Sequence, residues 1–162
     1  MNQRRSQSVP RSALESAVIS RLRERISGEP IGGRYENFER DKIVRAGLYK
    51  DNPEEGVNSY VTLGFSSNVL PSNGGSLPLG DGKELRVELM GIARRRFTQF
   101  DLILTSCAFC IMDGIVQAFP GDILYNSLSQ LRIKTKLTHC YFSADCGDDW
   151  KWEAIVVGKI AV

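Results

Sequence analysis

The sequence predicts an α+β fold in a single domain, with a mostly antiparallel sheet. Several short segments alternate apolar and polar residues, as strands do, and two other segments have the apolar spacing of helices. Strands and helices do not alternate regularly along the chain, which argues against a doubly wound parallel sheet. A chain of 162 residues is most simply one domain and needs no disulfide or metal to fold. We expect a disordered leader at residues 1–11 and the domain at residues 12–162.

The first expected element is an amphipathic helix that begins near Ser12. Ser12 and Glu15 form a capping-box pattern, in which the two side chains satisfy free backbone amides at the start of a helix. Apolar residues then recur every four positions, which predicts one buried face: they are Leu14, Val18, Leu22 and Ile26. Gly28 and Pro30 end the helix.

Four strands are expected in the middle of the chain, at residues 35–38, 43–49, 60–65 and 84–90. A flexible Gly32-Gly33 joint precedes the first, and a long loop at residues 66–82 follows the third. The fourth alternates apolar and charged residues, which predicts a half-buried antiparallel strand with Glu88 on its polar side. A further strand is expected at residues 131–137, and a last strand or pair of strands at residues 150–162.

Residues 102–112 contain no charged side chain, which predicts a helix buried on nearly all sides. These eleven residues are too few to cross a bilayer, which takes about 20. Thr98 and Asp101 suit the N-terminal cap and the first turn, and Gly114 suits a left-handed C-terminal stop. A Pro-Gly-Asp turn follows at residues 120–122. The composition of this stretch indicates a core element rather than an active site.

The net charge of +2 is distributed unevenly along the chain. Residues 1–50 carry 11 Lys and Arg against 6 Asp and Glu, whereas residues 51–162 carry 10 against 13. The basic excess has no dense run, so a solvated arm is favoured over a contact with nucleic acid or lipid. The N-terminus lacks the apolar segment of a secretory signal, and no stretch of about 20 apolar residues is present. We therefore expect a cytoplasmic protein with reduced cysteines.

The cysteines allow three interpretations. A four-thiolate zinc site has the right number of ligands, but the second pair has a poor spacing for a zinc knuckle: the residues are Cys107, Cys110, Cys140 and Cys146. A Cys-x-x-Cys redox pair normally follows a strand and begins a helix, whereas Cys107 and Cys110 are expected in mid-helix. Packing as small buried hydrophobic residues is favoured. We expect neither a metal nor another cofactor.

Few residues are candidates for catalysis. His139 is the only histidine, so any Ser-His-Asp or Cys-His mechanism has to use it. Asp145, Asp148 and Asp149 suit a cation site or an acid-base pair, although a solvated turn is favoured. The glycines near residues 74 and 80 lack the Gly-Lys-Ser/Thr ending of a phosphate-binding loop. A metal-dependent hydrolase built on the histidine and these acids stays open as an alternative, but we expect a protein that is not an enzyme.

Two groups of residues are candidates for protein contacts: Asp145, Asp148, Asp149 and Trp150 form the first, and Arg94 and Arg95 the second. Aromatic residues flanked by charge are common in interfaces, which favours the first group. The second belongs to a basic triplet at residues 94–96 and suits an acidic partner or a phosphate. A solvated connection before the buried helix is the simpler interpretation of this triplet.

Three segments, in this order, resemble a known family. Residues 60–66 read YVTLGFS, residues 83–89 read KELRVEL, and residues 119–124 read FPGDIL after the apolar helix. Together they are similar to the Suppressor-of-fused domain family, especially its short bacterial members, over roughly residues 36–162. The resemblance implies an α+β fold with a mixed sheet flanked by helices.

The resemblance also implies a binding protein. Eukaryotic members of the family restrain a transcription factor in Hedgehog signalling, and bacterial members look like immunity proteins of polymorphic toxin systems, which neutralise a toxin by binding it. The chain is too short to contain the second lobe of the animal protein, so the cleft between its lobes does not carry over. We expect a cognate protein toxin as the partner and no membrane or nucleic acid. A regulator that sequesters another cellular protein is the alternative.

Overall fold

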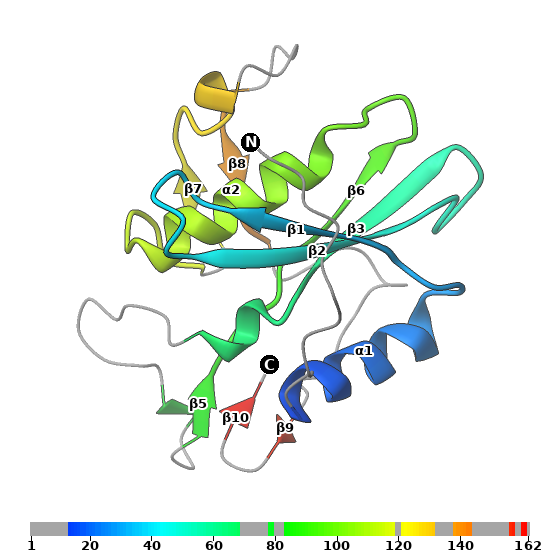
Figure 1. The fold of residues 1–162 in the computed structure, drawn as a ribbon, viewed down its shortest axis with the longest axis horizontal. Coiled ribbons are helices and arrows are strands. Elements are labelled where there is room, and N and C mark those ends of the chain that lie inside the picture. The colour runs from blue at the N-terminus through cyan, green and yellow to red at the C-terminus, as the bar shows by residue number, and fades with distance from the viewer. Residues whose placement is uncertain are drawn as a thin grey trace.

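A four-stranded antiparallel sheet carries a helix on each face (Figure 1). The structure, a computed structural model of the chain, describes residues 13–68, 78–79, 83–118, 121–131, 138–143, 156–157 and 160–161. The sheet has the order β1-β2-β3-β6: its strands are β1 (Ile31–Glu36), β2 (Ile43–Tyr49), β3 (Val57–Leu63) and β6 (Met90–Arg94). The helices are α1 (Ala13–Arg25) and α2 (Phe100–Met112). The predicted α+β single-domain fold is confirmed.

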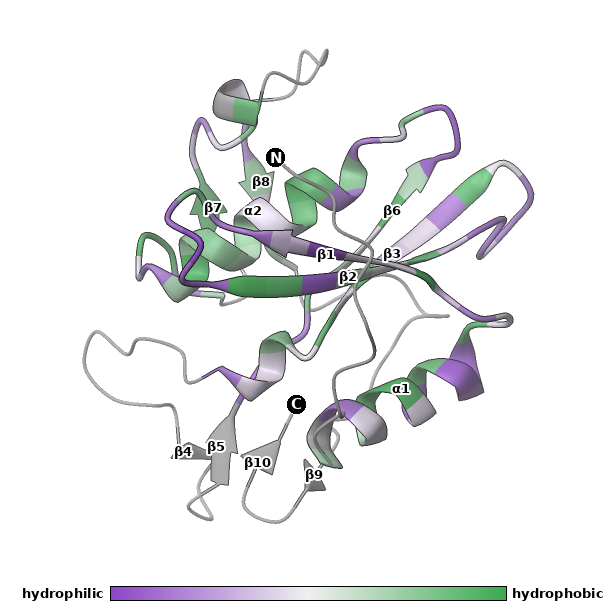
Figure 2. Cartoon of the chain, viewed as in Figure 1, coloured by the Kyte–Doolittle hydropathy of each residue, from purple (hydrophilic) through white to green (hydrophobic). Residues whose placement is uncertain are grey.

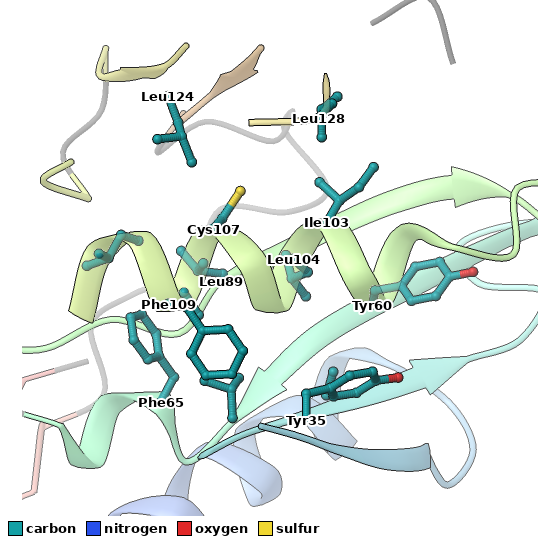
Figure 3. Close-up of a cluster of buried hydrophobic side chains, with 14 residues drawn as sticks. Tyr35, Tyr60, Phe65, Leu89, Ile103, Leu104, Cys107, Phe109, Leu124 and Leu128 are labelled. Carbon is teal, nitrogen blue, oxygen red and sulfur yellow. The ribbon is translucent and has the colours of Figure 1, made fainter. Parts of the chain in front are cut away.

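The helix α2 lies between the sheet and a small hairpin formed by β7 (Ile123–Leu124) and β8 (Cys140–Tyr141). Toward the sheet, Leu104 and Phe109 join a cluster with residues of β1, β2 and β3. On the opposite side, Figure 3 shows Cys107 pointing toward Leu124 of the hairpin. Because both sides are covered, a charged residue on either side of the helix would lose water without gaining a partner. The predicted helix, buried on nearly all sides, is confirmed.

The N-terminal end of α2 differs in detail from the prediction. Gln99 rather than Thr98 is the N-cap, and its side chain makes no capping hydrogen bond. The first-turn acid Asp101 instead accepts a hydrogen bond from the hydroxyl of Tyr35, which ties the helix to β1. At the other end Gly114 has a φ of 70°, so the predicted left-handed stop is confirmed.

The helix α1 covers the opposite face of the sheet. Its predicted apolar face is confirmed by the burial of Val18, Leu22 and Ile26, which pack against side chains of β2 and β3. Glu15 is also buried, and its carboxylate accepts a hydrogen bond from the Arg45 guanidinium of β2 at 2.7 Å. Figure 2 shows hydrophobic and hydrophilic residues interleaved along α1, whereas α2 is hydrophobic over most of its length. The α1 face is therefore held partly by charge.

A second sheet has the order β4-β5-β10-β9. Its strands are β4 (Pro78–Leu79), β5 (Lys83–Leu85), β9 (Val156–Val157) and β10 (Ile160–Ala161). The pair of β5 and β10 is parallel, and the other two pairs are antiparallel. The prediction of a mixed, mostly antiparallel arrangement is confirmed, and the end of the chain forms a pair of strands.

The expected single strand at residues 84–90 is wrong. The strand β5 ends at Leu85 and β6 begins at Met90, and the two belong to different sheets. Between them, Thr62 of β3 holds Leu89 in place: the Thr62 amide donates to the Leu89 carbonyl at 2.8 Å, and the Thr62 hydroxyl accepts from the Leu89 amide at 2.8 Å. Glu88, expected on the polar side, turns its carboxylate inward instead.

Three other boundaries also differ from the prediction. Gly32 and Gly33 lie inside β1 and are not a joint, and Phe38 lies in the turn after that strand. The strand β3 ends at Leu63, and Phe65 begins a short 3-10 helix, η1 (Phe65–Ser67). At Gly32 and Gly33, pairing of β1 with β2 outweighs the weak preference of glycine for strands.

Some expectations fall outside the described residues. These are the leader at residues 1–11, the capping role of Ser12, and most of the strand expected at residues 131–137. Residue Leu131 itself ends a second 3-10 helix, η2 (Ser129–Leu131). In the Pro-Gly-Asp turn, Pro120 lies outside as well, whereas Gly121 donates its amide to the Phe142 carbonyl at 2.9 Å.

Candidate protein-contact surface

The predicted basic contact residues lie at one end of the four-stranded sheet. Arg94 ends β6 and is exposed. Arg95 is also exposed, but its guanidinium lies 3.7 Å from the Asp51 carboxylate, and its backbone amide donates to the Gly56 carbonyl at 2.8 Å. Arg95 therefore contacts the turn between β2 and β3. Arg94 and Arg95 stay predicted contact residues.

The predicted acidic contact group lies outside the described residues. Asp145, Asp148, Asp149 and Trp150 fall in the range 144–155, of which the structure describes nothing. Their role in binding stays a prediction.

The histidine sits in a local structural arrangement. The Nδ1 atom of His139 accepts a hydrogen bond from the backbone amide of Asn126 at 2.9 Å. Its ring lies edge-on to the ring of Tyr125, with centroids 5.2 Å apart. In the part of the chain that the structure describes, His139 makes no hydrogen bond to a serine, a cysteine or an acid. This geometry favours the surface interpretation over a catalytic one.

Three cysteines meet at the junction of α2 and β8. Cys107 is buried on α2, and Cys110 and Cys140 are half-buried. Among the described residues, no group of three His, Cys, Asp or Glu side chains has the arrangement to hold a metal ion. Burial raises the pKa of the Cys110 thiol, as expected for a cysteine packed among apolar side chains. The predicted fourth ligand, Cys146, lies outside the described residues.

The buried carboxylate of Glu88 is the most densely hydrogen-bonded acid of the described residues. It accepts from the hydroxyls of Thr62 and Ser66, each at 2.6 Å, and from the backbone amides of Gly64, Phe65 and Ser66 at 2.9, 3.3 and 3.0 Å. Burial raises the pKa of Glu88, while these hydrogen bonds act in the opposite direction. Because its acceptor sites are used to hold η1 beside β3, the acid has a structural role.

An exposed aromatic face lies on the outer side of the β7–β8 hairpin. Ile123 and Tyr141 form a directly opposed pair, so their side chains share one face. Tyr125 and His139 continue that face beyond the strands. Tyr125 and Tyr141 are each 67% exposed. We call this surface, made of Ile123, Tyr125, His139 and Tyr141, the hairpin face.

The turn between β1 and β2 presents a further exposed aromatic residue. Phe38 is fully exposed in this turn. The turn is well ordered by hydrogen bonds, because the Asn37 side-chain oxygen accepts from the backbone amides of Asp41 and Lys42 at 3.1 and 3.0 Å. Lys42 also pairs with Asp113 at the C-terminal end of α2. Figure 1 shows this turn and the hairpin at the same end of the molecule.

Exposed aromatic side chains of this kind suit a protein contact. Isolated apolar residues on a surface are ordinary, but a face of several neighbouring ones is typical of interaction sites. Tyrosine and phenylalanine are enriched in interfaces, where they bury a large area with few rotatable bonds. The hairpin face and Phe38 are therefore the candidate contact surface of the described residues.

The sequence did not point to this surface. Phe38 looked like the end of a strand, and Tyr125 lay in a segment with no clear periodicity. A weak signal for Phe38 was present, because it stands alone between Asn37 and a run of charged residues. The two halves of the hairpin face are far apart in the chain, so only their pairing brings them together.

No helix in the described part of the chain has both the length and the apolar character needed to cross a membrane.

Of the comparisons with known proteins, one found a similar protein. No family model matches the chain, and no solved structure matches it significantly. The chain is 26% identical over 129 residues to a protein of Bacillus subtilis (strain 168) named Immunity protein YqcF. The match covers 79% of this chain and 64% of that protein, so the chain spans less than two thirds of its relative. This distant homologue supports an immunity-protein-like family, and the Suppressor-of-fused resemblance stays a prediction.

Proposed function

We propose that this chain is an immunity protein, which binds a cognate protein toxin, neutralises it and catalyses no reaction. The similarity to Immunity protein YqcF carries the proposal. The three segments similar to bacterial Suppressor-of-fused members support the same class and suggest a polymorphic toxin system. A binding protein of this kind needs a stable scaffold and a surface with a few anchoring side chains.

The described residues offer both requirements. The sheet and its two helices form the scaffold. The hairpin face and Phe38 offer aromatic anchors that are exposed in the free protein and would lose water on binding. Binding through such anchors blocks a toxin by covering it, so no catalytic residue is required. Arg94, Arg95 and the acidic group before Trp150 are further predicted contacts.

Co-expression with the toxin encoded by the neighbouring gene tests the proposal. We expect cells that carry both genes to grow and the two proteins to purify together as one complex. Cells that die in spite of abundant folded protein, or a toxin that elutes alone, would contradict it.

Surface variants locate the contact. Tyr141→Asp and Phe38→Asp are expected to leave the fold intact and to weaken toxin binding by about 30-fold each, which is about 2 kcal/mol. The matched control is Ile92→Asp, because Ile92 is also an exposed apolar residue (52%) but lies on β6, on the α1 side of the sheet. Titration calorimetry of purified proteins measures the three affinities. If all three variants bind the toxin as tightly as wild type does, the contact lies elsewhere, and the proposed function is unaffected.

The hydrolase alternative is tested separately. Metal analysis of the purified protein and the variant His139→Ala address it directly. An immunity protein is expected to contain no stoichiometric metal and to protect cells equally well without this imidazole. Bound metal together with lost protection in the variant would favour the hydrolase.

A further inference from the structure

The sulfur atoms of Cys107 and Cys140 meet at the junction of α2 with the β7–β8 hairpin. Cys140 faces inward from β8, opposite Leu124 of β7. Figure 3 shows the Cys107 sulfur pointing from α2 toward that same Leu124. The two thiols are close enough for each to shift the pKa of the other. Residues from distant parts of the chain thus bring two thiols into contact.

The surroundings of the two sulfurs differ. The Cys140 sulfur lies beside the Cys107 thiol and 3.4 Å from the oxygen of the Ser127 hydroxyl, whose hydrogen is shared with the Leu124 carbonyl 3.2 Å away. Its neighbours Cys107 and Ser127 lower the pKa of the Cys140 thiol, which favours the thiolate form. Cys107 is only 5% exposed, and its neighbour Cys140 and its burial raise its pKa. In this pair, therefore, Cys140 is the more acidic thiol and Cys107 the less acidic one.

We propose that Cys140 is an oxidation-sensitive site that reacts with hydroperoxides and then forms a disulfide with Cys107. In the first step the Cys140 thiolate attacks one oxygen of the hydroperoxide. The O–O bond breaks, the leaving oxygen takes a proton, and Cys140 becomes a sulfenic acid. In the second step the Cys107 sulfur attacks the Cys140 sulfur, and its proton leaves with the hydroxyl as water. In total the two thiols lose two electrons, and one hydroperoxide accepts them.

The second step is assisted by the first. Once Cys140 is a sulfenic acid, the thiolate that raised the pKa of Cys107 is gone, so Cys107 loses its proton more easily. A disulfide bond requires sulfurs about 2.05 Å apart, which is closer than a hydrogen-bonded pair. The strand β8 has to move slightly, against its two residue pairs with β7 and the flanking backbone hydrogen bonds of Phe142 to Gly121 and Asp122.

Cys110 is the nearest competitor and is less suited to the reaction. It lies one turn after Cys107 on α2, and its pKa is raised by burial and by the charges of Asp113 and Cys140. Among the described residues, no side chain donates a hydrogen bond to its sulfur. Cys110 is therefore expected to remain a thiol while Cys140 reacts.

The disulfide would fasten the hairpin face to the core helix. Cys107 and Cys140 close a loop of about 34 residues, which restricts the unfolded chain substantially. The expected consequence is a rise of roughly 10 °C in the midpoint of thermal unfolding after oxidation. This inference does not depend on the proposed binding to a toxin.

Treatment of the full chain with hydrogen peroxide, followed by peptide mass spectrometry without reduction, tests the proposal. We expect a Cys107–Cys140 cross-link, the rise in melting temperature, and reversal of both by dithiothreitol. The control variants Cys110→Ser and Cys146→Ser are expected to form the same cross-link. Cys107→Ala is expected to stop at the sulfenic acid, which dimedone traps on Cys140. Peroxide-treated protein with free thiols at both positions, or cross-links to Cys110 or Cys146 instead, would overturn the proposal.

A second measurement needs no variant. Iodoacetamide labelling of the native wild-type protein at pH 7 is expected to modify Cys140 at least tenfold faster than Cys107 and Cys110. Faster labelling of Cys110 than of Cys140 would also overturn the proposal.

Discussion

The two faces of the four-stranded sheet are covered by helices that are held by different interactions. The α2 face is apolar on both sides of its helix, and even the Thr105 hydroxyl is satisfied within the helix, by the Asp101 carbonyl at 2.8 Å. The α1 face combines one apolar stripe with a charged pair, Glu15 and Arg45. Between its polar contacts at the two helix ends, Tyr35 with Asp101 and Lys42 with Asp113, the α2 face therefore depends on exclusion of water, whereas the α1 face has a charged pair within it. This contrast predicts which substitutions unfold the domain and which only weaken it.

The largest effect is expected for a charge placed under α2. Phe109→Asp leaves an unpaired carboxylate in the main cluster, where Phe109 is 8% exposed. The loss of the ring alone costs about 3–5 kcal/mol, which approaches the whole stability of an ordinary domain. We expect an unfolded or insoluble protein, measured by circular dichroism and urea unfolding. A soluble variant with the wild-type unfolding curve would show that the α2 face is not the dominant core.

The next effect is expected at the acid that holds η1 beside β3. Glu88→Ala removes the acceptor of the Thr62 and Ser66 hydroxyls and of three backbone amides. Buried donors left without an acceptor cost about 1–3 kcal/mol. We expect a loss of about 3 kcal/mol in the free energy of unfolding, with the fold retained. A change below about 0.5 kcal/mol would mean that water replaces the carboxylate at no cost.

The same acid predicts a pH dependence. Burial raises the pKa of Glu88 above its ordinary 4.5, so the folded state holds this proton more tightly than the unfolded state. Stability from this proton is therefore present below pH 4.5 and is lost as the pH rises through the folded pKa. Urea unfolding at a series of pH values is expected to show the advantage of wild type over Glu88→Gln decreasing as the pH rises. An advantage that grows with pH would reverse the assigned direction.

A smaller effect is expected on the α1 face. Arg45→Ala removes one charged partner of Glu15. Glu15 is 4% exposed, whereas the Arg45 side chain is 36% exposed. Because solvent screens the pair in part, we expect a loss of about 1–2 kcal/mol in the free energy of unfolding. The matched control is Arg34→Ala, since Arg34 lies directly opposite Arg45 in the sheet and pairs with Glu36 near the surface. Equal effects of the two variants would show that the burial of Glu15 adds nothing.

The smallest effect on stability is expected outside both faces. Phe38→Ala changes a fully exposed side chain whose turn is ordered by Asn37, so the free energy of unfolding should shift by less than about 0.5 kcal/mol. Thermal unfolding measures this shift. A loss of unfolding free energy as large as that of Arg45→Ala would mean that Phe38 packs against the domain and is not free to contact another protein.

Local patterns predicted the elements that carry their own signal. The spacing of Val18, Leu22 and Ile26 indicated α1, and the uncharged run at residues 102–112 indicated a helix covered on all sides. These predictions succeeded because a helix repeats every 3.6 residues, so residues three or four positions apart lie on the same face and show whether that face is buried. The stop at Gly114 succeeded for a similar reason, since a left-handed residue at a helix end favours glycine.

Predictions failed where a residue's partner is distant in the chain. Glu88 alternates with apolar neighbours as a surface residue would, and only the approach of η1 and β3 makes it an inward acceptor. The capping box of Ser12 and Glu15 lies in part outside the described residues, but the contact of Glu15 with Arg45 of β2 was not predicted. In both cases the free energy of burying a charge depends on donors that the local sequence does not contain.

The contact surface and the thiol pair belong to the same category. Ile123 and Tyr141 become one face, and Cys107 and Cys140 become one site, only when β7 pairs with β8 over α2. The chain alone determined a domain of two helices and an antiparallel sheet around an apolar helix, because these follow from short-range periodicity. The tertiary structure decided which side chains meet and which remain exposed, because long-range contacts arise from packing and leave no local pattern.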